Sequence, residues 1–341
     1  MRGVVMHGPG DIRVEERADP TIVEPTDAII RVTASCVCGS DLWSYRGIDP
    51  VNGPTPMGHE YVGVVEEIGA DVRNVKVGDF VVGGWSATDN TCENCLAGYH
   101  GNCVHTVIMG GEIGTQAERA RIPLADGTLV ATPSEPTPEQ VRNLLTASDV
   151  LATGWFAAVA AEAGPGKTVA VVGDGAVGLL GVLAAKQLGA ERIIAMSRHA
   201  DRQKLALELG ATDIVTERGA DGVAKIKELT GGFGAHSVIE AVGTQESIMQ
   251  AIHSTRPGGH VGYVGMSHDV SLNLFEVMLA SVHLHGGPSP VRRFLPQFID
   301  LIMRGEINPG VVFDLTLPLD QAADAYRAMD ERRATKVLLV P

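Results

Sequence analysis

The chain has 341 residues, of which 45% are hydrophobic and 20% charged, a size and composition typical of a globular protein with about two domains. Its 41 acidic residues exceed the 27 Lys and Arg residues, giving a net charge of −14, which argues against binding to nucleic acid or to an anionic membrane surface. No apolar run approaches the length of a membrane span, and the start, MRGVVMHGPGD, lacks a secretory apolar region, so we expect a cytoplasmic protein.

The first 135 residues contain short β-type segments separated by Pro and Gly, a pattern that predicts a meandering, partly open β-barrel. The clearest of these segments are Ala28–Thr33, Tyr61–Ile68, Val77–Val82 and Ala120–Leu124. A helix is predicted to follow at Thr137, because this capping hydroxyl precedes Pro138 at the first helical position.

From about residue 150, buried-type strands alternate with segments of helical length, which predicts an α/β fold with a doubly wound parallel sheet. The six expected strands are Val169–Val172, Arg192–Ser197, Asp213–Val215, His236–Ala241, His260–Val264 and Val282–His285. After Pro290 we expect a helix, a Pro-bounded turn, a second helix and a closing strand, Lys336–Val340.

A glycine-rich turn follows the first of these strands and opens an apolar helix that runs to Leu188. This turn reads Gly173-Asp174-Gly175-Ala176-Val177-Gly178, which matches G-x-G-x-x-G. In a dinucleotide-binding loop the first glycine permits the turn, the second lets the backbone approach a pyrophosphate, and the third lets the helix pack closely. The helix N-terminus, with its free N–H groups, then faces the phosphates. The strand and helix on either side make dinucleotide binding the favoured interpretation.

The end of the second strand indicates which dinucleotide is bound. An NAD site has an acidic residue there for the ribose 2′-hydroxyl, whereas this chain has Ser197 and Arg198 and no acid between Ile193 and Ala200. An arginine can bind a 2′-phosphate through two hydrogen bonds, so we predict a preference for NADP(H) over NAD(H). The alternative is that Arg198 is a solvated charge and that selectivity is loose.

The five cysteines are too few and odd in number for a disulfide framework. The spacing Cys92-x2-Cys95-x7-Cys103 indicates a metal site instead. Cys38 and His59 are a second candidate pair, because a thiolate and an imidazole both suit zinc. The alternative is that both are ordinary buried residues.

The segment around His59 carries a resemblance to a known family. It reads Gly58-His59-Glu60-x2-Gly63-x5-Gly69 and resembles the zinc motif of the zinc-dependent alcohol dehydrogenases, members of the medium-chain dehydrogenase/reductase superfamily. The resemblance extends over essentially the whole chain. It implies a GroES-like catalytic domain, residues 1–152 and 287–341, around a Rossmann domain, residues 153–286.

The resemblance also implies two zinc sites. The catalytic Zn2+ would be held by Cys38, His59 and Asp149, where many members have Cys in place of the aspartate, with Glu60 as an outer or exchanging ligand. The structural Zn2+ would be held by four residues, of which the first replaces the usual cysteine: Asp89, Cys92, Cys95 and Cys103. Cys36 matches no family role and is expected to be a small buried residue.

Further roles follow from the same resemblance. Ser40 matches the hydroxyl that takes the alcohol's proton; the alternative, which is compatible with that role, is a turn serine that caps the following helix. Relatives often carry a proton-relay His where this chain has Trp43, so the relay is expected to be shorter. Thr153 matches a residue that contacts the nicotinamide, and the remaining expected cofactor contacts are Gly265, Gly286 and Gly287.

The implied activity is hydride transfer between NADP(H) and a small alcohol, aldehyde or ketone, with zinc lowering the pKa of the alcohol. The expected partners are this small molecule and further copies of the chain, with no nucleic acid and no membrane. Two alternatives stay open: a polyol or sugar-alcohol dehydrogenase of the same superfamily, and a non-catalytic NADPH-binding structural protein. The second typically lacks the zinc ligands that are present here.

Overall fold

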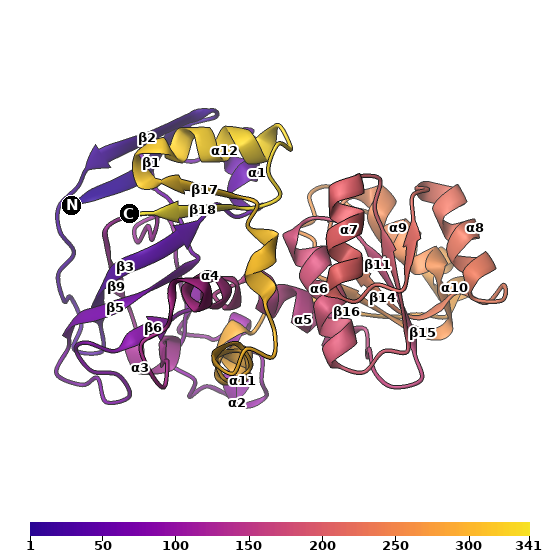
Figure 1. The fold of residues 1–341 in the computed structure, drawn as a ribbon, viewed down its shortest axis with the longest axis horizontal. Coiled ribbons are helices and arrows are strands. Elements are labelled where there is room, and N and C mark those ends of the chain that lie inside the picture. Colours follow the sequence, from indigo (N-terminus) through magenta and orange to yellow (C-terminus); the bar gives the residue numbers. More distant parts are fainter. The chain divides into compact units, whose positions relative to one another are not determined.

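The computed structural model describes all residues, 1–341, and divides the chain into two compact units (Figure 1). The first unit comprises Met1–Ala152 and Pro290–Pro341, and the second comprises Thr153–Ser289. The helix α5 (Val150–Ala160) contains the division between them. None of the helices combines the length and the apolar character needed to cross a membrane.

The first unit is built on a seven-stranded, mostly antiparallel sheet in the order β10-β6-β5-β3-β18-β17, with β9 also pairing with β3. Its strands are β3 (Ala28–Cys36), β5 (Tyr61–Ile68), β6 (Phe80–Val82), β9 (Arg119–Ile122), β10 (Val130–Ala131), β17 (Leu315–Pro318) and β18 (Val337–Val340). The predicted β-rich front is confirmed. A turn alone was predicted where β17 lies, and this was wrong, because β17 pairs in parallel with the closing strand β18.

Two smaller sheets and several short helices complete this unit. The small sheets are β2-β1-β4, with β1 (Arg2–Gly8), β2 (Asp11–Glu16) and β4 (Thr55–Pro56), and the pair β7 (Ser86–Ala87) and β8 (Val107–Ile108). The helices are α1 (Asp41–Tyr45), α2 (Glu93–Leu96), α3 (Ala125–Thr128), α4 (Pro138–Ala147), α11 (Val291–Met303) and α12 (Ala322–Asp330), with 3-10 turns at His100–Asn102, Pro309–Val312 and Leu319–Gln321.

Local sequence explains the helix that leads to the candidate site. The predicted start of α4 is confirmed: Thr137 accepts a hydrogen bond from the N–H of Gln140, whose side chain bonds back to the N–H of Thr137. The C-terminal segment, yellow in Figure 1, packs α12 against the indigo hairpin of β1 and β2. Tyr326 of α12 is fully buried there with Met6. The two segments of this unit therefore share one core.

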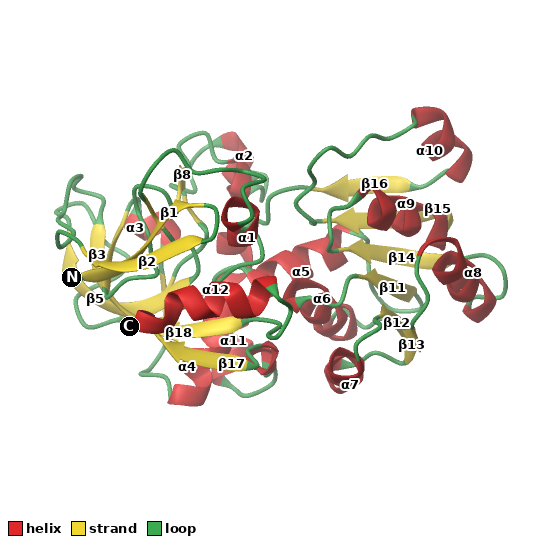
Figure 2. Ribbon diagram, turned by 90° about the horizontal axis from the view of Figure 1, so that it is seen from above, coloured by secondary structure: helices red, strands yellow, loops and turns green.

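The second unit contains the predicted parallel sheet, with six strands in the order β13-β12-β11-β14-β15-β16, which Figure 2 shows stacked in this sequence. The strands are β11 (Thr168–Val172), β12 (Arg192–Met196), β13 (Asp213–Val215), β14 (Ala235–Glu240), β15 (Thr255–Tyr263) and β16 (His283–Gly286). Its remaining helices are α6 (Ala176–Gln187), α7 (Ala200–Leu209), α8 (Gly219–Leu229), α9 (Gln245–Ser254) and α10 (Leu274–Ala280). This is the strand order of a dinucleotide-binding fold, so the doubly wound prediction is confirmed.

Candidate metal centres and nucleotide site

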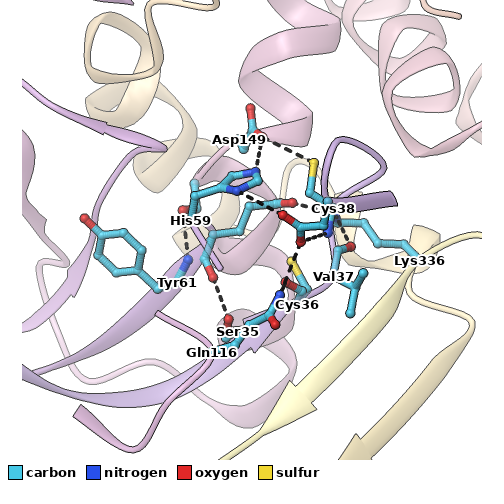
Figure 3. Close-up of polar contacts among 12 residues, drawn as sticks. Ser35, Cys36, Val37, Cys38, His59, Tyr61, Gln116, Asp149 and Lys336 are labelled. Atoms are coloured by element: carbon cyan, nitrogen blue, oxygen red, sulfur yellow. Dashed lines mark hydrogen bonds and ion pairs between the residues drawn. The ribbon is translucent and has the colours of Figure 1, made fainter. Parts of the chain in front are cut away.

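Three side chains from separate segments of the first unit converge on one point (Figure 3). Cys38 follows β3, His59 precedes β5, and Asp149 lies in the two-residue turn between α4 and α5. The Sγ of Cys38 lies 3.7 Å from Oδ2 of Asp149, and the Nε2 of His59 lies 3.4 Å from the same oxygen. With Glu60, they form a group whose ligand atoms all lie within 4.8 Å of one another.

These separations can be compared with those that zinc requires. Tetrahedral zinc, with bonds of about 2.0–2.3 Å, holds neighbouring ligand atoms about 3.3–3.8 Å apart. The distances of 3.7 and 3.4 Å fall within this range, and the atoms involved are the S, N and O donors that zinc accepts. The donor atoms of Cys38, His59 and Asp149, and the distances from Asp149 to the other two, therefore fit a zinc ion.

Backbone constraints hold two of these residues in place. Gly58 has φ +99°, and a Cβ there would lie 2.5 Å from the backbone N of Gln116, so only glycine can turn the chain toward His59. Ser148 is fully buried, donates to the carbonyl of Gly83 at 2.6 Å and accepts from the N–H of Tyr61 at 3.0 Å. Ser148 thereby fixes the turn that carries the neighbouring Asp149.

Asp41 contacts both Cys38 and His59, a role that sequence analysis missed. Its Oδ2 accepts from the N–H of Cys38 at 3.0 Å, and its Oδ1 lies 3.5 Å from Nδ1 of His59. Burial alone would lower the pKa of His59, but Cys38, Asp41 and Asp149 raise it well above its usual value. The surroundings of the imidazole therefore favour positive charge. The motif Cys38-Gly39-Ser40-Asp41 contained the signal, because Asp41 is the acid nearest to Cys38 in sequence.

Glu60 lies beside the group and pairs with Lys336, a second residue that sequence analysis missed. The Nζ of Lys336 lies 2.7 Å from Oε1 of Glu60. It also donates to the carbonyl of Val37 at 3.2 Å, and Figure 3 labels both of these residues. Both side chains are essentially inaccessible to solvent, at 1% and 0% exposure. The second oxygen of Glu60, Oε2, is buried without a hydrogen bond from the chain, which leaves it available as an exchanging metal ligand.

Ser40 lies at the start of α1, but its side chain does not cap this helix, so that part of the expectation was wrong. Its backbone is already helical, with φ −69° and ψ −31°, whereas a capping residue adopts an extended conformation. The hydroxyl of Ser40 is consequently not committed to the helix end.

Cys36 is buried, as expected.

The second candidate metal-binding group lies between β7 and β8. The Sγ of Cys92 lies 3.5 Å from that of Cys95 and 4.0 Å from that of Cys103, and Oδ1 of Asp89 lies 3.3 Å from Sγ of Cys103. All four ligand atoms lie within 4.8 Å of one another, so this group of thiol and carboxylate donors could hold a metal ion such as zinc. Hydrogen bonds from the backbone N–H groups of Val104 and Cys95 lower the pKa of Cys92 to about 7, which favours the thiolate that binds metal.

Two neighbours orient the aspartate that replaces a cysteine in this group. The Oδ2 of Asp89 accepts from the hydroxyl of Thr91 at 2.7 Å and lies 2.7 Å from Nδ1 of His105. Its other oxygen, Oδ1, faces Cys103. Oδ1 also accepts a hydrogen bond from the N–H of Thr91 at 3.1 Å, so the protein orients both oxygens of this carboxylate, which sequence analysis did not foresee.

The glycines of the phosphate loop are sterically required at two of their three positions. Gly173 has φ +120°, and a Cβ on Gly178 would lie 2.1 Å from the carbonyl oxygen of Gly173. At Gly175, in contrast, a Cβ would meet nothing within 4 Å. The backbone at Gly175 thus borders open space just before Ala176 and Val177 begin α6, as a site for a pyrophosphate requires.

The other predicted cofactor contacts lie at the same edge of this sheet. Gly265 follows β15, and Gly286 and Gly287 end and follow β16, so all three lie at the carboxyl ends of parallel strands. Gly286 approaches its neighbour closely, since a Cβ there would lie 2.0 Å from the carbonyl oxygen of Tyr263, whereas Gly287 borders open space. Thr153 lies in α5, at the first position of this unit.

The end of β12 differs from the sequence-based expectation in one respect. Arg198 is exposed and its side chain makes no ion pair with the chain, but Ser197 is buried and donates to Asp174 of the phosphate loop at 2.7 Å. Arg202 and Arg218 approach the same carboxylate at 3.3 and 3.7 Å. Sequence analysis missed both arginines, because Arg202 lies in α7 and Arg218 follows β13, and the two meet only in the folded unit.

Comparison with known proteins agrees with this geometry. Residues 24–134 match the alcohol dehydrogenase GroES-like domain and residues 176–303 match the zinc-binding dehydrogenase family. A protein of Mycobacterium tuberculosis described as a probable zinc-binding alcohol dehydrogenase is 38% identical, over 96% of this chain and 84% of its own length. Zinc-type alcohol dehydrogenase B of Aspergillus flavus is 33% identical, over 99% of this chain and 81% of its own length.

Among solved structures, alcohol dehydrogenase TADH from Thermus sp. ATN1 superimposes with a TM-score of 0.91 at 32% identity, covering 100% of this chain and 99% of that one. Sequence similarity over nearly the whole chain and the same fold confirm the resemblance that the His59 motif carries. The chain belongs to the zinc-dependent alcohol dehydrogenases of the medium-chain dehydrogenase/reductase superfamily.

Proposed function

We propose that this chain is an NADP(H)-preferring dehydrogenase that interconverts a small alcohol with its aldehyde or ketone. The observation that carries the proposal is the convergence of Cys38, His59 and Asp149 at separations suited to one zinc ion. Family membership supplies the reaction class, and these three residues are the ones proposed to hold the catalytic metal. Their presence argues against a non-catalytic NADPH-binding protein.

When bound, zinc supplies Lewis-acid polarisation of the substrate oxygen, and the nicotinamide cofactor accepts or donates the hydride. The chain's own contribution is to position these groups and to move a proton. The Oγ of Ser40, free of any capping bond, is proposed to accept the proton of the alcohol and to return it in reduction. Asp41 holds the ring of His59 and the backbone of Cys38, and Lys336 holds Glu60.

The proposed preference for NADP(H) rests on the charges at the end of β12. Arg198 follows β12 and is exposed, and Arg202 and Arg218 flank the carboxylate of Asp174, so three guanidinium groups lie in this part of the second unit. A 2′-phosphate carries negative charge and several acceptor oxygens, which guanidinium groups bind well. The unpaired guanidinium of Arg198 is the first group that we assign to it.

Steady-state kinetics test the proposal. We expect kcat/KM for NADP+ to exceed that for NAD+ by about tenfold or more, because one charge-assisted contact contributes about 1.5–3 kcal/mol. The measurement uses a panel of primary, secondary, aromatic and polyol alcohols with both cofactors. A clear preference for NAD+ contradicts the cofactor assignment, and turnover confined to polyols supports the alternative substrate class.

Metal content tests the second site. We expect about two zinc ions per purified chain, falling to about one in Asp89→Ala, because this change removes one of four ligands. The matched control is Asp89→Cys, which introduces the family's usual ligand and is expected to keep both ions. Elemental analysis together with the melting temperature reads out the loss. About one zinc ion in the unmodified chain would contradict the assignment of the Asp89 group.

A further inference from the structure

The cations assigned to the 2′-phosphate surround a carboxylate that belongs to the phosphate loop itself. Asp174 follows β11, Ser197 follows β12, and Arg218 follows β13, while Arg202 lies in the first turn of α7. Because β13, β12 and β11 are adjacent parallel strands, the loops at their carboxyl ends come together at one edge of the sheet. The group therefore lies where a dinucleotide-binding fold places the adenosine ribose.

Both oxygens of Asp174 are engaged within this group. Its Oδ2 accepts a hydrogen bond from Oγ of Ser197 at 2.7 Å and lies 3.7 Å from Nη2 of Arg218, while Oδ1 lies 3.3 Å from Nη1 of Arg202. Burial would raise the pKa of Asp174, but Ser197, Arg202 and Arg218 lower it below its usual value. The side chain is therefore an anion at neutral pH.

This anion competes with a 2′-phosphate for the same partners. A serine hydroxyl has one proton, so Ser197 cannot donate to Asp174 and to a phosphate at the same time. A phosphate beside Arg202 and Arg218 would also be repelled by the carboxylate between them. A 2′-hydroxyl, in contrast, is neutral and can donate a hydrogen bond to the same carboxylate.

We propose that Asp174 is a specificity-determining residue that competes with the cofactor's 2′-phosphate for Ser197, Arg202 and Arg218 and so restrains the preference for NADP(H). The inference rests on the proposed function, in which Arg198, Arg202 and Arg218 bind the 2′-phosphate. The choice between NADP(H) and NAD(H) then depends on a residue of the phosphate loop as well as on the residues at the end of β12. Removing the charge of Asp174 strengthens binding of the phosphorylated cofactor specifically.

Calorimetric titration of the full, zinc-loaded chain tests the inference without relying on turnover. The two probes are adenosine 2′,5′-bisphosphate and 5′-AMP, which differ only in the 2′-phosphate. In Asp174→Asn we expect the Kd ratio of 5′-AMP to the bisphosphate to rise about tenfold or more, because a like charge has been removed. Asp174→Ser, a second uncharged variant, should give the same direction. The matched control is Asp201→Asn on the exposed first turn of α7, with a change below about twofold.

The outcomes separate the two proposals. The ratio in the unmodified chain measures the preference for the 2′-phosphate, so a ratio near one contradicts the proposed function. The change in the ratio on substitution measures Asp174 alone, whatever the starting value. A ratio that falls or stays constant in variants that bind 5′-AMP overturns the inference. Loss of 5′-AMP binding in both variants also overturns it, because Asp174 would then be holding the site together.

Discussion

Replacing Asp149 by alanine is expected to lower kcat about a thousandfold or more while changing the Kd for NADP(H) little. The reason is that a catalytic zinc needs about three protein ligands, and Asp149 supplies the oxygen that lies 3.7 Å from Cys38 and 3.4 Å from His59. The candidate residues of the dinucleotide loop belong to the second unit, whereas Asp149 belongs to the first. Turnover, zinc content and NADPH fluorescence titration measure the three quantities separately.

A matched variant distinguishes loss of a ligand from a general disturbance. Asp149→Cys offers a thiolate, the ligand that many members of the family have at this position, and is expected to retain zinc and a substantial share of kcat. A chelator applied to the unmodified chain should reproduce the alanine variant, with turnover lost and NADPH binding kept. Full zinc content and unchanged turnover in Asp149→Ala would show that this carboxylate is not a ligand.

Much of the fold could be predicted because the relevant signals are local. Runs of buried residues such as Val169–Val172 predicted the six parallel strands, and the cap at Thr137 with Pro138 predicted the start of α4. The strand β17 was missed because Leu315–Pro318 is short and ends in proline. This segment forms a strand by pairing with β18, and the local sequence contains no signal that predicts this pairing.

Only those residues of the candidate site that belong to a recognisable motif could be predicted from the sequence. Cys38, His59 and Asp149 were matched to a family pattern, and the structure brings their ligand atoms together. Lys336 could not be found in this way, because a lysine at the start of a strand is ordinarily exposed and its partner Glu60 is 276 residues away. Asp174 was read only as the variable residue of a glycine loop, since its contacts depend on how three strands are ordered.

Replacing Lys336 by methionine is expected to destabilise the protein by about 3–5 kcal/mol. Burial lowers the pKa of Lys336, but Cys36 and Glu60 raise it well above its usual value, so the buried amine is charged. Its loss would leave Glu60, which is fully inaccessible to solvent, without a compensating charge. Denaturant unfolding of the zinc-loaded chain, followed through Trp43 and Trp85 of the first unit, measures the change.

A double-mutant cycle assigns this loss to the ion pair. Lys336→Met combined with Glu60→Gln is expected to recover most of the stability, because a buried pair replaced by neutral groups no longer leaves an unpaired charge. The matched control is Lys76→Met, since Lys76 and Asp79 form an ion pair at 2.8 Å whose lysine is 81% exposed, and such pairs contribute about 0–1 kcal/mol. If Lys76→Met and Lys336→Met lower the free energy of unfolding by the same amount, burial does not strengthen the contribution of the Lys336–Glu60 pair to stability. If the double variant is less stable than either single one, Lys336 acts through its contact with the carbonyl of Val37 instead.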